Sequence, residues 1–226
     1  MRIPSRLAFI ALGLTTAVFA QSSAFAVSLT EPVSPASFAD TALGGTTVAA
    51  RPELAGAVLE DSLQAFDFQG MTGTVQSRVV REAGGTLDFY WKVSVDESAT
   101  GTGISALRVA NFAYGDLKDA DWRMDSLGNV APTTARLFNK VIYPAGDINF
   151  LFGDGIGAGQ ASYLFFLHTN ATSYAKTGMY DLLNVGPQNL SPVFSTFAPA
   201  VPEPSTCALL VAGLAMVGVA ARRRQA

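Results

Sequence analysis

The stretch TLDFYWKVSV at residues 86–95 alternates apolar and polar side chains without a break. One set of alternate positions holds Leu, Phe, Trp, Val and Val, and the set between them holds Asp, Tyr, Lys and Ser. Successive side chains of a strand point to opposite faces, so this period of two predicts a half-buried strand of an antiparallel sheet. Gly84 and Gly85 come just before it, and residues 75–81 are also strand-like, which predicts a β-hairpin.

Further strands are predicted on both sides of this hairpin. Residues 162–169 are apolar on both faces, which predicts a central strand in a covered sheet. Residues 104–114 are strand-like but change phase after Val109, which predicts a β-bulge near Ala110 and Asn111. Shorter strands are predicted at residues 137–143, 147–152, 179–183 and 193–197.

Helical patterns are scarce. Residues 53–66 fit either an amphipathic helix or two short strands around Val58 and Phe66, and both alternatives stay open. A helical turn within a loop is predicted for residues 116–125, and a flexible hairpin loop for the glycine-rich residues 153–159. The pattern as a whole predicts an all-β protein with a single antiparallel β-sandwich. The strand order is not predicted, and a jelly roll is one topology that stays open.

The two flanks of this domain have a different composition. Residues 27–51 are rich in Ala, Ser, Thr and Pro, and we expect them to be loosely ordered at first. Residues 191–204 repeat Pro and small residues, which predicts an extended linker. The sandwich itself is therefore assigned to residues 27–198, and the proline-rich linker to residues 199–206.

Cysteine content and charge exclude several classes of protein. Cys207 is the only cysteine of the 226 residues, so residues 27–200 cannot form disulfides. That segment holds ten Lys or Arg against seventeen Asp or Glu, a formal charge of −7, without a basic cluster. Phosphate backbones favour basic faces, so we expect no nucleic acid partner.

Catalytic motifs are nearly absent. His168 is the only histidine, and its apolar strand predicts a core or edge histidine with one satisfied hydrogen bond. No Gly-x-Ser-x-Gly elbow occurs, and the spacing of residues 153–159 fits neither phosphate-loop pattern. We therefore expect no enzyme activity and no catalytic residues. Paired carboxylates for glycoside hydrolysis stay open, because their separation depends on the fold.

Four aspartates form a weak candidate for a calcium site around Trp122. They are Asp116, Asp119, Asp121 and Asp125. Calcium prefers oxygen ligands, but the spacing is not that of an EF-hand, and Lys118 and Arg123 offset part of the charge. A solvated acidic loop is the favoured interpretation, with no cofactor expected. Tyr90 and Trp122 are candidates for stacking on sugar rings or for packing a second sheet.

The N-terminal segment has the pattern of a secretory signal peptide. Residues 1–6 carry two positive charges, residues 7–19 are apolar, and Ala24 and Ala26 supply a small-x-small cleavage site. Residues 1–26 are therefore predicted to be removed by signal peptidase after export through the Sec machinery. Cleavage after Ala20 and an uncleaved signal anchor are the alternatives.

The C-terminal segment combines three features in order. They are Val201, Pro202, Glu203, Pro204 and Ser205, then the apolar run 207–221, then Arg222, Arg223 and Arg224 within the basic segment 222–226. A helix over the apolar run would be about 22 Å long, shorter than the roughly 30 Å hydrocarbon core. The arginines resist translocation, which predicts a transmembrane helix with its basic end in the cytoplasm. So short a span suits brief retention in the inner membrane, and an ordinary tail anchor is the alternative.

These features together resemble the PEP-CTERM protein-sorting domain, over residues 201–224. The same segment is also labelled an ice-binding-protein C-terminal domain, although it implies no ice binding. The resemblance implies a substrate of an exosortase, an integral-membrane cysteine transpeptidase of Gram-negative bacteria. Such an enzyme would cut near the triplet and pass the ectodomain to the cell surface or extracellular matrix. By this resemblance Pro202, Glu203 and Pro204 are recognition residues in a substrate.

Three functions remain open at this stage. The favoured one is a non-catalytic surface or matrix protein with a structural or adhesive role. The second is a carbohydrate-binding module for exopolysaccharide. The resemblance gives it some support, because exosortase systems accompany exopolysaccharide production. The third, an exported hydrolase, is disfavoured by the shortage of nucleophile, base and metal-ligand sets.

Overall fold

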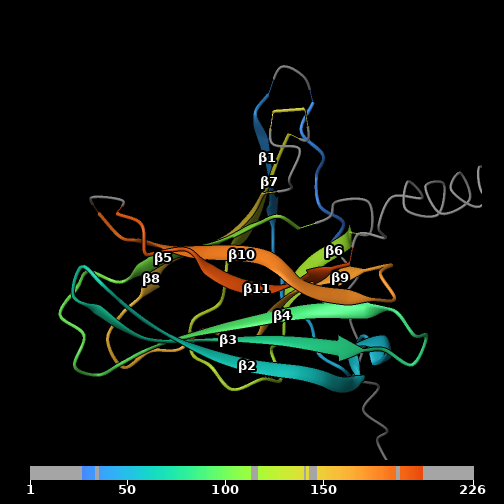
Figure 1. The fold of residues 1–226 in the computed structure, drawn as a ribbon, viewed down its shortest axis with the longest axis horizontal. Helices are drawn as coiled ribbons and strands as arrows, with labels where there is room; N and C mark the ends of the chain where they lie inside the picture. The colour runs from blue at the N-terminus through green and yellow to red at the C-terminus, as the bar shows by residue number, and fades with distance from the viewer. Residues whose placement is uncertain are drawn as a thin grey trace, which may run out of the picture.

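The computed structural model describes residues 27–33, 36–112, 117–139, 141–142, 147–186 and 189–200. Within these ranges the chain is all-β, with two antiparallel sheets and one short 3-10 helix, η1 (Pro52–Leu54). The two sheets lie face to face as a sandwich, as predicted (Figure 1). The segments 1–26, 201–205, 207–221 and 222–226, on which the export and sorting predictions fall, lie outside the described residues. Within the ranges given above, no helix is long and apolar enough to span a membrane.

The sheet that contains the hairpin, here called sheet A, has five strands. In spatial order they are β2 (Ala57–Phe68), β3 (Met71–Arg81), β4 (Leu87–Val95), β9 (Phe165–Thr169) and β6 (Leu117–Trp122). The predicted hairpin is confirmed, because β3 pairs with β4 from Gly73 opposite Val95 to Arg81 opposite Leu87. The predicted central strand is also confirmed: β9 lies between β4 and β6, and all five of its residues are buried.

The second sheet, here called sheet B, has six strands. In spatial order they are β1 (Phe38–Ala42), β7 (Thr134–Phe138), β8 (Ile148–Ile156), β5 (Ile104–Ala110), β10 (Tyr174–Asn184) and β11 (Phe194–Pro199). The paired strands β1 and β7 rise away from the body of the sandwich, and we call this projection the β1–β7 arm (Figure 1). At its other edge the sheet ends in β11, the last described strand.

Aromatic rings fill the space between the sheets. Trp91 of β4 lies 6.2 Å from Phe112, 6.3 Å from Phe150 and 6.4 Å from Phe165, measured between ring centroids. Each such pair adds about 0.5–1.5 kcal/mol beyond the burial of its surface. The apolar positions of residues 86–95 thus face the core as predicted, and all five are buried.

The opposite face of β4 departs from the prediction. Lys92 and Ser94 are partly exposed, but Asp88 and Tyr90 are buried. Leu54, Val80, Tyr90 and Phe166 form a second, smaller apolar cluster on this face of sheet A. A covering segment that includes η1 therefore buries one end of a strand whose sequence alone indicates a solvated face.

Residues 53–66 are not a helix. After η1 they enter β2, one continuous strand rather than two short ones, which pairs with β3 along its whole length. A register shift between Val58 and Glu60 explains why the strand lacks a simple alternation. Pairing with a neighbouring strand here outweighs the local helical spacing.

Several predicted loops are strands. Residues 117–122 form β6 instead of a helical turn, and β8 continues through the glycine-rich stretch to Ile156. Residues 38–42 form β1, so the segment predicted to be loose is tied into sheet B. Strand β11 confirms the strand predicted at residues 193–197 and overlaps the predicted linker. In each case small or polar side chains are compatible with a strand once a partner strand supplies the hydrogen bonds.

The predicted bulge at Ala110 and Asn111 is also corrected. Strand β5 ends at Ala110, and Asn111 adopts a φ of 59°, in the left-handed region that asparagine tolerates. This turn directs Phe112 into the core, where it is fully buried. The change of phase therefore marks the end of the strand, and the irregular pairing lies between Ile104 and Ala106.

Candidate functional site

A row of polar side chains crosses the outer face of sheet A. His168 of β9 lies opposite Asp88 of β4 on one side and opposite Asp119 of β6 on the other. Glu82 follows β3 directly, and a turn closed by two backbone bonds with Thr86 and Gly85 holds it beside the row. The hairpin turn and the strand register therefore bring together four titratable groups from three separate parts of the sequence.

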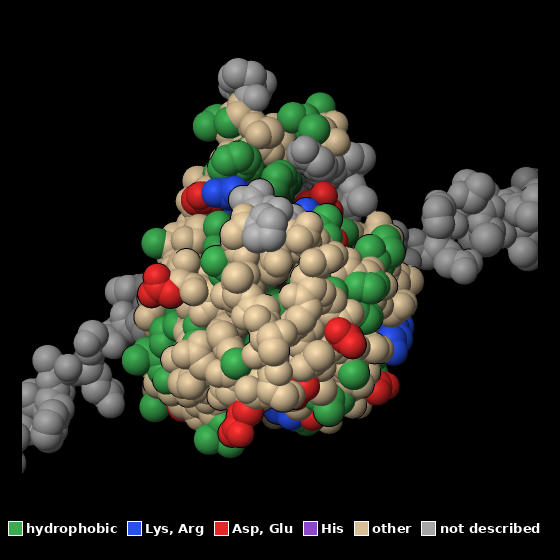
Figure 2. All heavy atoms as spheres, turned by 90° about the vertical axis from the view of Figure 1, so that its left-hand side faces the viewer, with side chains coloured by type: hydrophobic (Ala, Val, Ile, Leu, Met, Phe, Trp, Pro, Cys, Tyr) green, Lys and Arg blue, Asp and Glu red, His purple; other side chains and the backbone are tan. Residues whose placement is uncertain are grey.

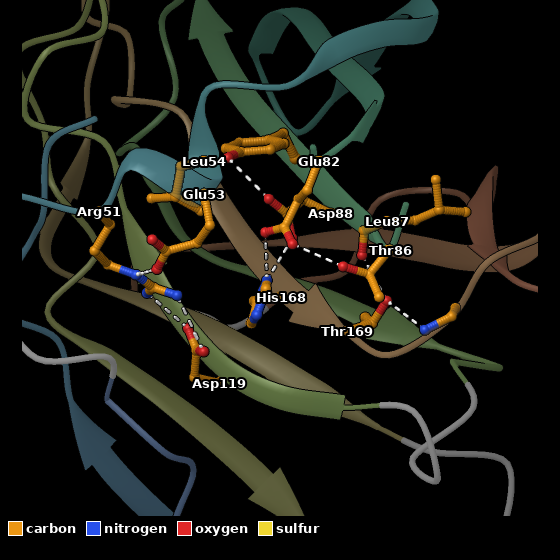
Figure 3. A network of polar contacts seen from close by, with 12 residues as sticks. Arg51, Glu53, Leu54, Glu82, Thr86, Leu87, Asp88, Asp119, His168 and Thr169 are labelled. Carbon is orange, nitrogen blue, oxygen red and sulfur yellow. Dashed lines mark hydrogen bonds and ion pairs between the residues drawn. The ribbon is translucent and has the colours of Figure 1, made fainter. Parts of the chain in front are cut away.

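Three of these groups converge on one point (Figure 3). Nδ1 of His168 lies 2.7 Å from Oδ1 of Asp88 and 2.9 Å from Oε1 of Glu82. The exposed fractions are 7% for Glu82, 0% for Asp88 and 7% for His168. We call these three residues the EDH cluster.

One hydrogen-bonding atom of the EDH cluster is left unsatisfied. A ring nitrogen carries a single hydrogen, and Nδ1 of His168 bonds Asp88, so Oε1 of Glu82 receives no hydrogen bond despite its short distance. The other oxygens are engaged. Thr86 donates to Oε2 of Glu82 at 2.7 Å, and Tyr90 lies within 3.4 Å of Oδ2 of Asp88.

Burial and neighbouring charges shift the pKa values of Asp88 and His168. Burial raises the pKa of Asp88 to about 6, and the charge of Glu82 raises it too, whereas the bond from His168 opposes the rise. Burial alone would lower the pKa of His168. The hydrogen bond to Asp88 and the charges of Asp88, Asp119 and Glu82 outweigh it, so that pKa lies above its usual value. Both shifts favour an added positive charge in the cluster.

The remaining acid of the row is neutralised by Arg51. The guanidinium donates to both oxygens of Asp119, at 2.9 and 3.2 Å, and its Nε donates to Glu53 at 2.9 Å (Figure 3). Burial works to lower the pKa of Arg51, but the two carboxylates raise it above the usual value, so the side chain stays charged. Arg51 thus balances the charge of Asp119, and the unbalanced negative charge of the row lies at Glu82 and Asp88.

Sheet B carries a second polar row on its outer face. Arg136 of β7 and Arg108 of β5 lie opposite Asn149 of β8, one on each side. Each arginine also forms a two-pronged pair with an aspartate of the next strand, Arg136 with Asp40 at 2.7 and 2.8 Å and Arg108 with Asp181 at 2.6 Å twice. A hollow of about 310 Å³ opens on this face. Its polar lining includes Arg108, Asp147, Asn149 and Asp181, and its apolar lining includes Phe138, Met179 and Val193.

The three described aspartates of the four suggested for calcium are engaged by separate partners. Asp119 binds Arg51, and Asp121 accepts the backbone N–H groups of Gly45 and Trp122 at 2.8 and 3.0 Å. Asp125 pairs with Arg123 at 2.6 Å, and Asp116 lies outside the described residues. The expectation of a solvated loop is wrong for Asp119 and Asp121, which are 3% and 1% exposed on a strand, whereas Asp125 is exposed.

The two aromatic residues suggested for sugar stacking are covered. Tyr90 is 2% exposed and packs on Phe166, with ring centroids 5.1 Å apart. Trp122 is partly buried, and its ring lies 4.9 Å from that of Tyr163. Packing accounts for both residues, although Tyr90 packs against a neighbouring strand of its own sheet and not against a second sheet.

The sequence indicated the burial of His168 but not its neighbours. Asp88 stands on the polar face of an alternating strand, a place where an aspartate is normally solvated. Only the register of β4 against β9, and the turn that follows β3, bring Asp88 and Glu82 to the imidazole. The one local signal was a histidine at a buried strand position, where it needs a partner.

Comparison with known proteins concerns the other end of the chain. No curated protein and no solved structure matches the sequence. A family model described as the PEP-CTERM protein-sorting motif matches residues 200–224, which agrees with the resemblance found in the sequence. The chain therefore carries the PEP-CTERM protein-sorting motif, which marks it as an exported protein targeted to an exosortase and to the cell surface.

Proposed function

We propose that the sandwich is a non-catalytic surface or matrix domain with a structural or adhesive role. The observation that carries this proposal is the position of the sorting motif relative to the fold. Strand β11 ends at Pro199, and the motif begins at residue 200. Cleavage near Pro202 to Ser205 would therefore release both sheets intact and leave no part of the described core behind.

The state of the chain's single histidine supports a non-catalytic role. His168 is buried in the EDH cluster, and so are the two carboxylates that converge there. A glycoside hydrolase needs carboxylates on both sides of an accessible sugar. The hydrolase alternative therefore gains no support from this cluster.

An adhesive role is supported by the β1–β7 arm. Several large apolar side chains on or beside it are exposed: Val33 by 79%, Phe38 by 41%, Val141 by 90% and Ile142 by 52%. Hydrophobic side chains gather at this end of the molecule (Figure 2). Exposed apolar groups that cluster on a projection mark interaction surfaces more often than scattered ones do.

Delivery can be tested by mass spectrometry of the protein recovered from the surface of producing cells. We expect ends at Val27 and near residues 202–205. A surface-recovered chain that still reaches Ala226 would reject exosortase processing. A variant with Pro202, Glu203 and Pro204 all replaced by Ala should fold normally and stay in the cell membrane fraction.

The adhesive role can be tested on intact cells with correctly delivered variants. Replacing Phe38, Val141 and Ile142 by Ser should lower cell-to-cell or cell-to-matrix attachment severalfold. Leu63→Ser with Leu127→Ser is the matched control, since these side chains are 69% and 84% exposed but lie elsewhere. Equal attachment by the two variants at equal surface amounts would contradict an adhesive arm.

The second candidate function is binding of exopolysaccharide in the hollow of sheet B. Its support is the lining, in which charged and amide groups stand beside Phe138 and Met179. Asn149→Ala should weaken binding of the organism's own polysaccharide about tenfold if the amide holds a sugar hydroxyl. Gln76→Ala on sheet A is the control, and calorimetry on both variants separates a specific site from general adsorption.

A further inference from the structure

We propose that the EDH cluster is a binding site for a divalent transition-metal ion of the Zn²⁺ or Mn²⁺ type. One imidazole nitrogen and two carboxylate oxygens, from Glu82, Asp88 and His168, offer a ligand atom each within 4.8 Å of one another. Imidazole and carboxylate together suit zinc and manganese, whereas calcium and magnesium favour oxygen alone. The proposal is independent of the function proposed above.

The first argument is the unsatisfied oxygen. Oε1 of Glu82 is buried and accepts no hydrogen bond, and its 2.9 Å contact with Nδ1 of His168 is an ion pair only when the imidazole is protonated. Buried carboxylate oxygens are nearly always paired, because removing them from water without a partner is costly. A cation between Glu82, Asp88 and His168 would pair this oxygen and the opposing Oδ1 of Asp88 at once.

The second argument is charge. Two carboxylates surround one imidazole, so with both carboxylates ionised the cluster keeps a net negative charge even when His168 is protonated. The nearest described arginine of the row is already committed to Asp119 and Glu53. A divalent ion bound to a neutral imidazole would balance both carboxylates.

The third argument is the support around the ligands. Each carboxylate turns one oxygen towards His168 and the other towards a hydroxyl, that of Thr86 for Glu82 and that of Tyr90 for Asp88. Such outer contacts orient the ligands of metal sites and hold them ready. Asp88 and His168 also stand on paired strands, which fixes their backbones relative to one another.

The three ligand atoms must move slightly apart before a metal ion fits between them. Ligand atoms around a tetrahedral zinc ion lie about 3.3 Å apart when each bond is about 2.0 Å. The contacts of 2.7 and 2.9 Å are hydrogen-bond distances, so the side chains must separate by about half an ångström. Glu82 and His168 are buried but keep 7% of their surface exposed, and this is the side from which an ion would enter.

The test is metal binding by the full chain, purified without a histidine tag in detergent and stripped with EDTA. We expect ZnCl₂ or MnCl₂ to bind with one-to-one stoichiometry in calorimetry and to raise the melting temperature, with CaCl₂ having no such effect. Glu82→Gln keeps the shape and the contact with Thr86 but removes the charge. It should weaken binding at least tenfold.

Two comparisons keep the result decisive. Glu97→Gln changes an exposed glutamate and should bind the metal like the unaltered chain. The metal-free Glu82→Gln protein should melt at or above the melting temperature of the unaltered metal-free chain, because a buried charge has been removed. This comparison shows whether weaker metal binding results from the loss of a ligand or from a loss of folding. The proposal would be overturned if no saturable binding is seen, or if the Glu82→Gln and unaltered proteins bind equally. Protonation would then be the way in which the cluster balances its negative charge.

Discussion

Trp91 of β4 donates a hydrogen bond of 2.9 Å from Nε1 to Oγ1 of Thr196 in β11, and this bond joins the two sheets through the core. The residues are 105 positions apart in the sequence, and both are buried. The contact ties the last described strand, which directly precedes the sorting motif, to the middle strand of sheet A.

Replacing Thr196 by Val should therefore destabilise the domain by about 1–3 kcal/mol, since it leaves the indole N–H buried without an acceptor. Urea denaturation of the purified protein measures this change. Ser195→Val, on the exposed side of the same strand, should change stability by less than about 0.5 kcal/mol. Equal effects of the two substitutions would show that the inter-sheet bond contributes nothing.

Arg51→Met, in the segment that covers sheet A, should be among the most destabilising substitutions. It leaves Asp119 buried and unpaired, for which a cost of about 3–5 kcal/mol is expected. The double variant Arg51→Met with Asp119→Leu should recover most of that loss, because no charge is then left buried. Chemical denaturation of the single and double variants checks both statements.

A surface pair provides the contrast for this prediction. Arg78 and Asp61 also form an ion pair, but their side chains are 26% and 39% exposed. Arg78→Met should cost less than about 1 kcal/mol. A cost as large as that of Arg51→Met would mean that burial does not set the strength of these pairs.

The limits of prediction from the sequence follow from the same residues. Alternation within residues 86–95 is a local property, so it was enough to predict β4 and the direction of Trp91. The burial of Asp119 depends on Arg51, 68 residues away, and the environment of His168 depends on Asp88, 80 residues away. Contacts between residues so far apart depend on the strand register and on the order of strands in the sheet. Neither can be deduced from a short stretch of sequence. For the same reason the glycine-rich end of β8 and the polar strand β6 were predicted as loops.

Acid should weaken the β1–β7 arm through Asp40. The hydrogen bond and charge of Arg136 hold the pKa of Asp40 below its usual value of 3.8, against a smaller opposing effect of burial. A carboxyl with a lowered pKa in the folded state contributes stability above its unfolded pKa, and that stability is lost as the pH falls through the folded value. The loss is therefore expected from about pH 4 downwards.

The Arg136→Met variant isolates this contribution. Its free energy of unfolding should fall less steeply below about pH 4 than that of the unaltered chain. The difference should stay under about 1 kcal/mol, because Asp40 and Arg136 are 43% and 29% exposed and solvent screens the pair. Urea titrations at several pH values measure it. Repeating them in about 1 M salt, where exposed pairs are screened, should remove most of the difference.

Gly45→Ala tests the packing that covers Trp122. Gly45 has a φ of 79°, and a Cβ built there would lie 2.5 Å from Cζ2 of the Trp122 ring. Its N–H also donates to the buried carboxylate of Asp121, so the backbone cannot move away freely. The substitution combines an unfavourable backbone conformation with a displaced ring, and we expect a loss of about 1–3 kcal/mol.

The neighbouring glycine is a close control for that substitution. A Cβ at Gly44 would meet nothing within 4 Å, so Gly44→Ala should leave stability nearly unchanged. Tryptophan emission separates the two variants further, because displacement of Trp122 exposes its ring to water while Trp91 stays in the core. Gly45→Ala should therefore shift the emission to longer wavelength, and Gly44→Ala should not. If Gly45→Ala melts like the unaltered chain and emits at the same wavelength, the close contact between residue 45 and the indole ring is not a feature of the folded protein.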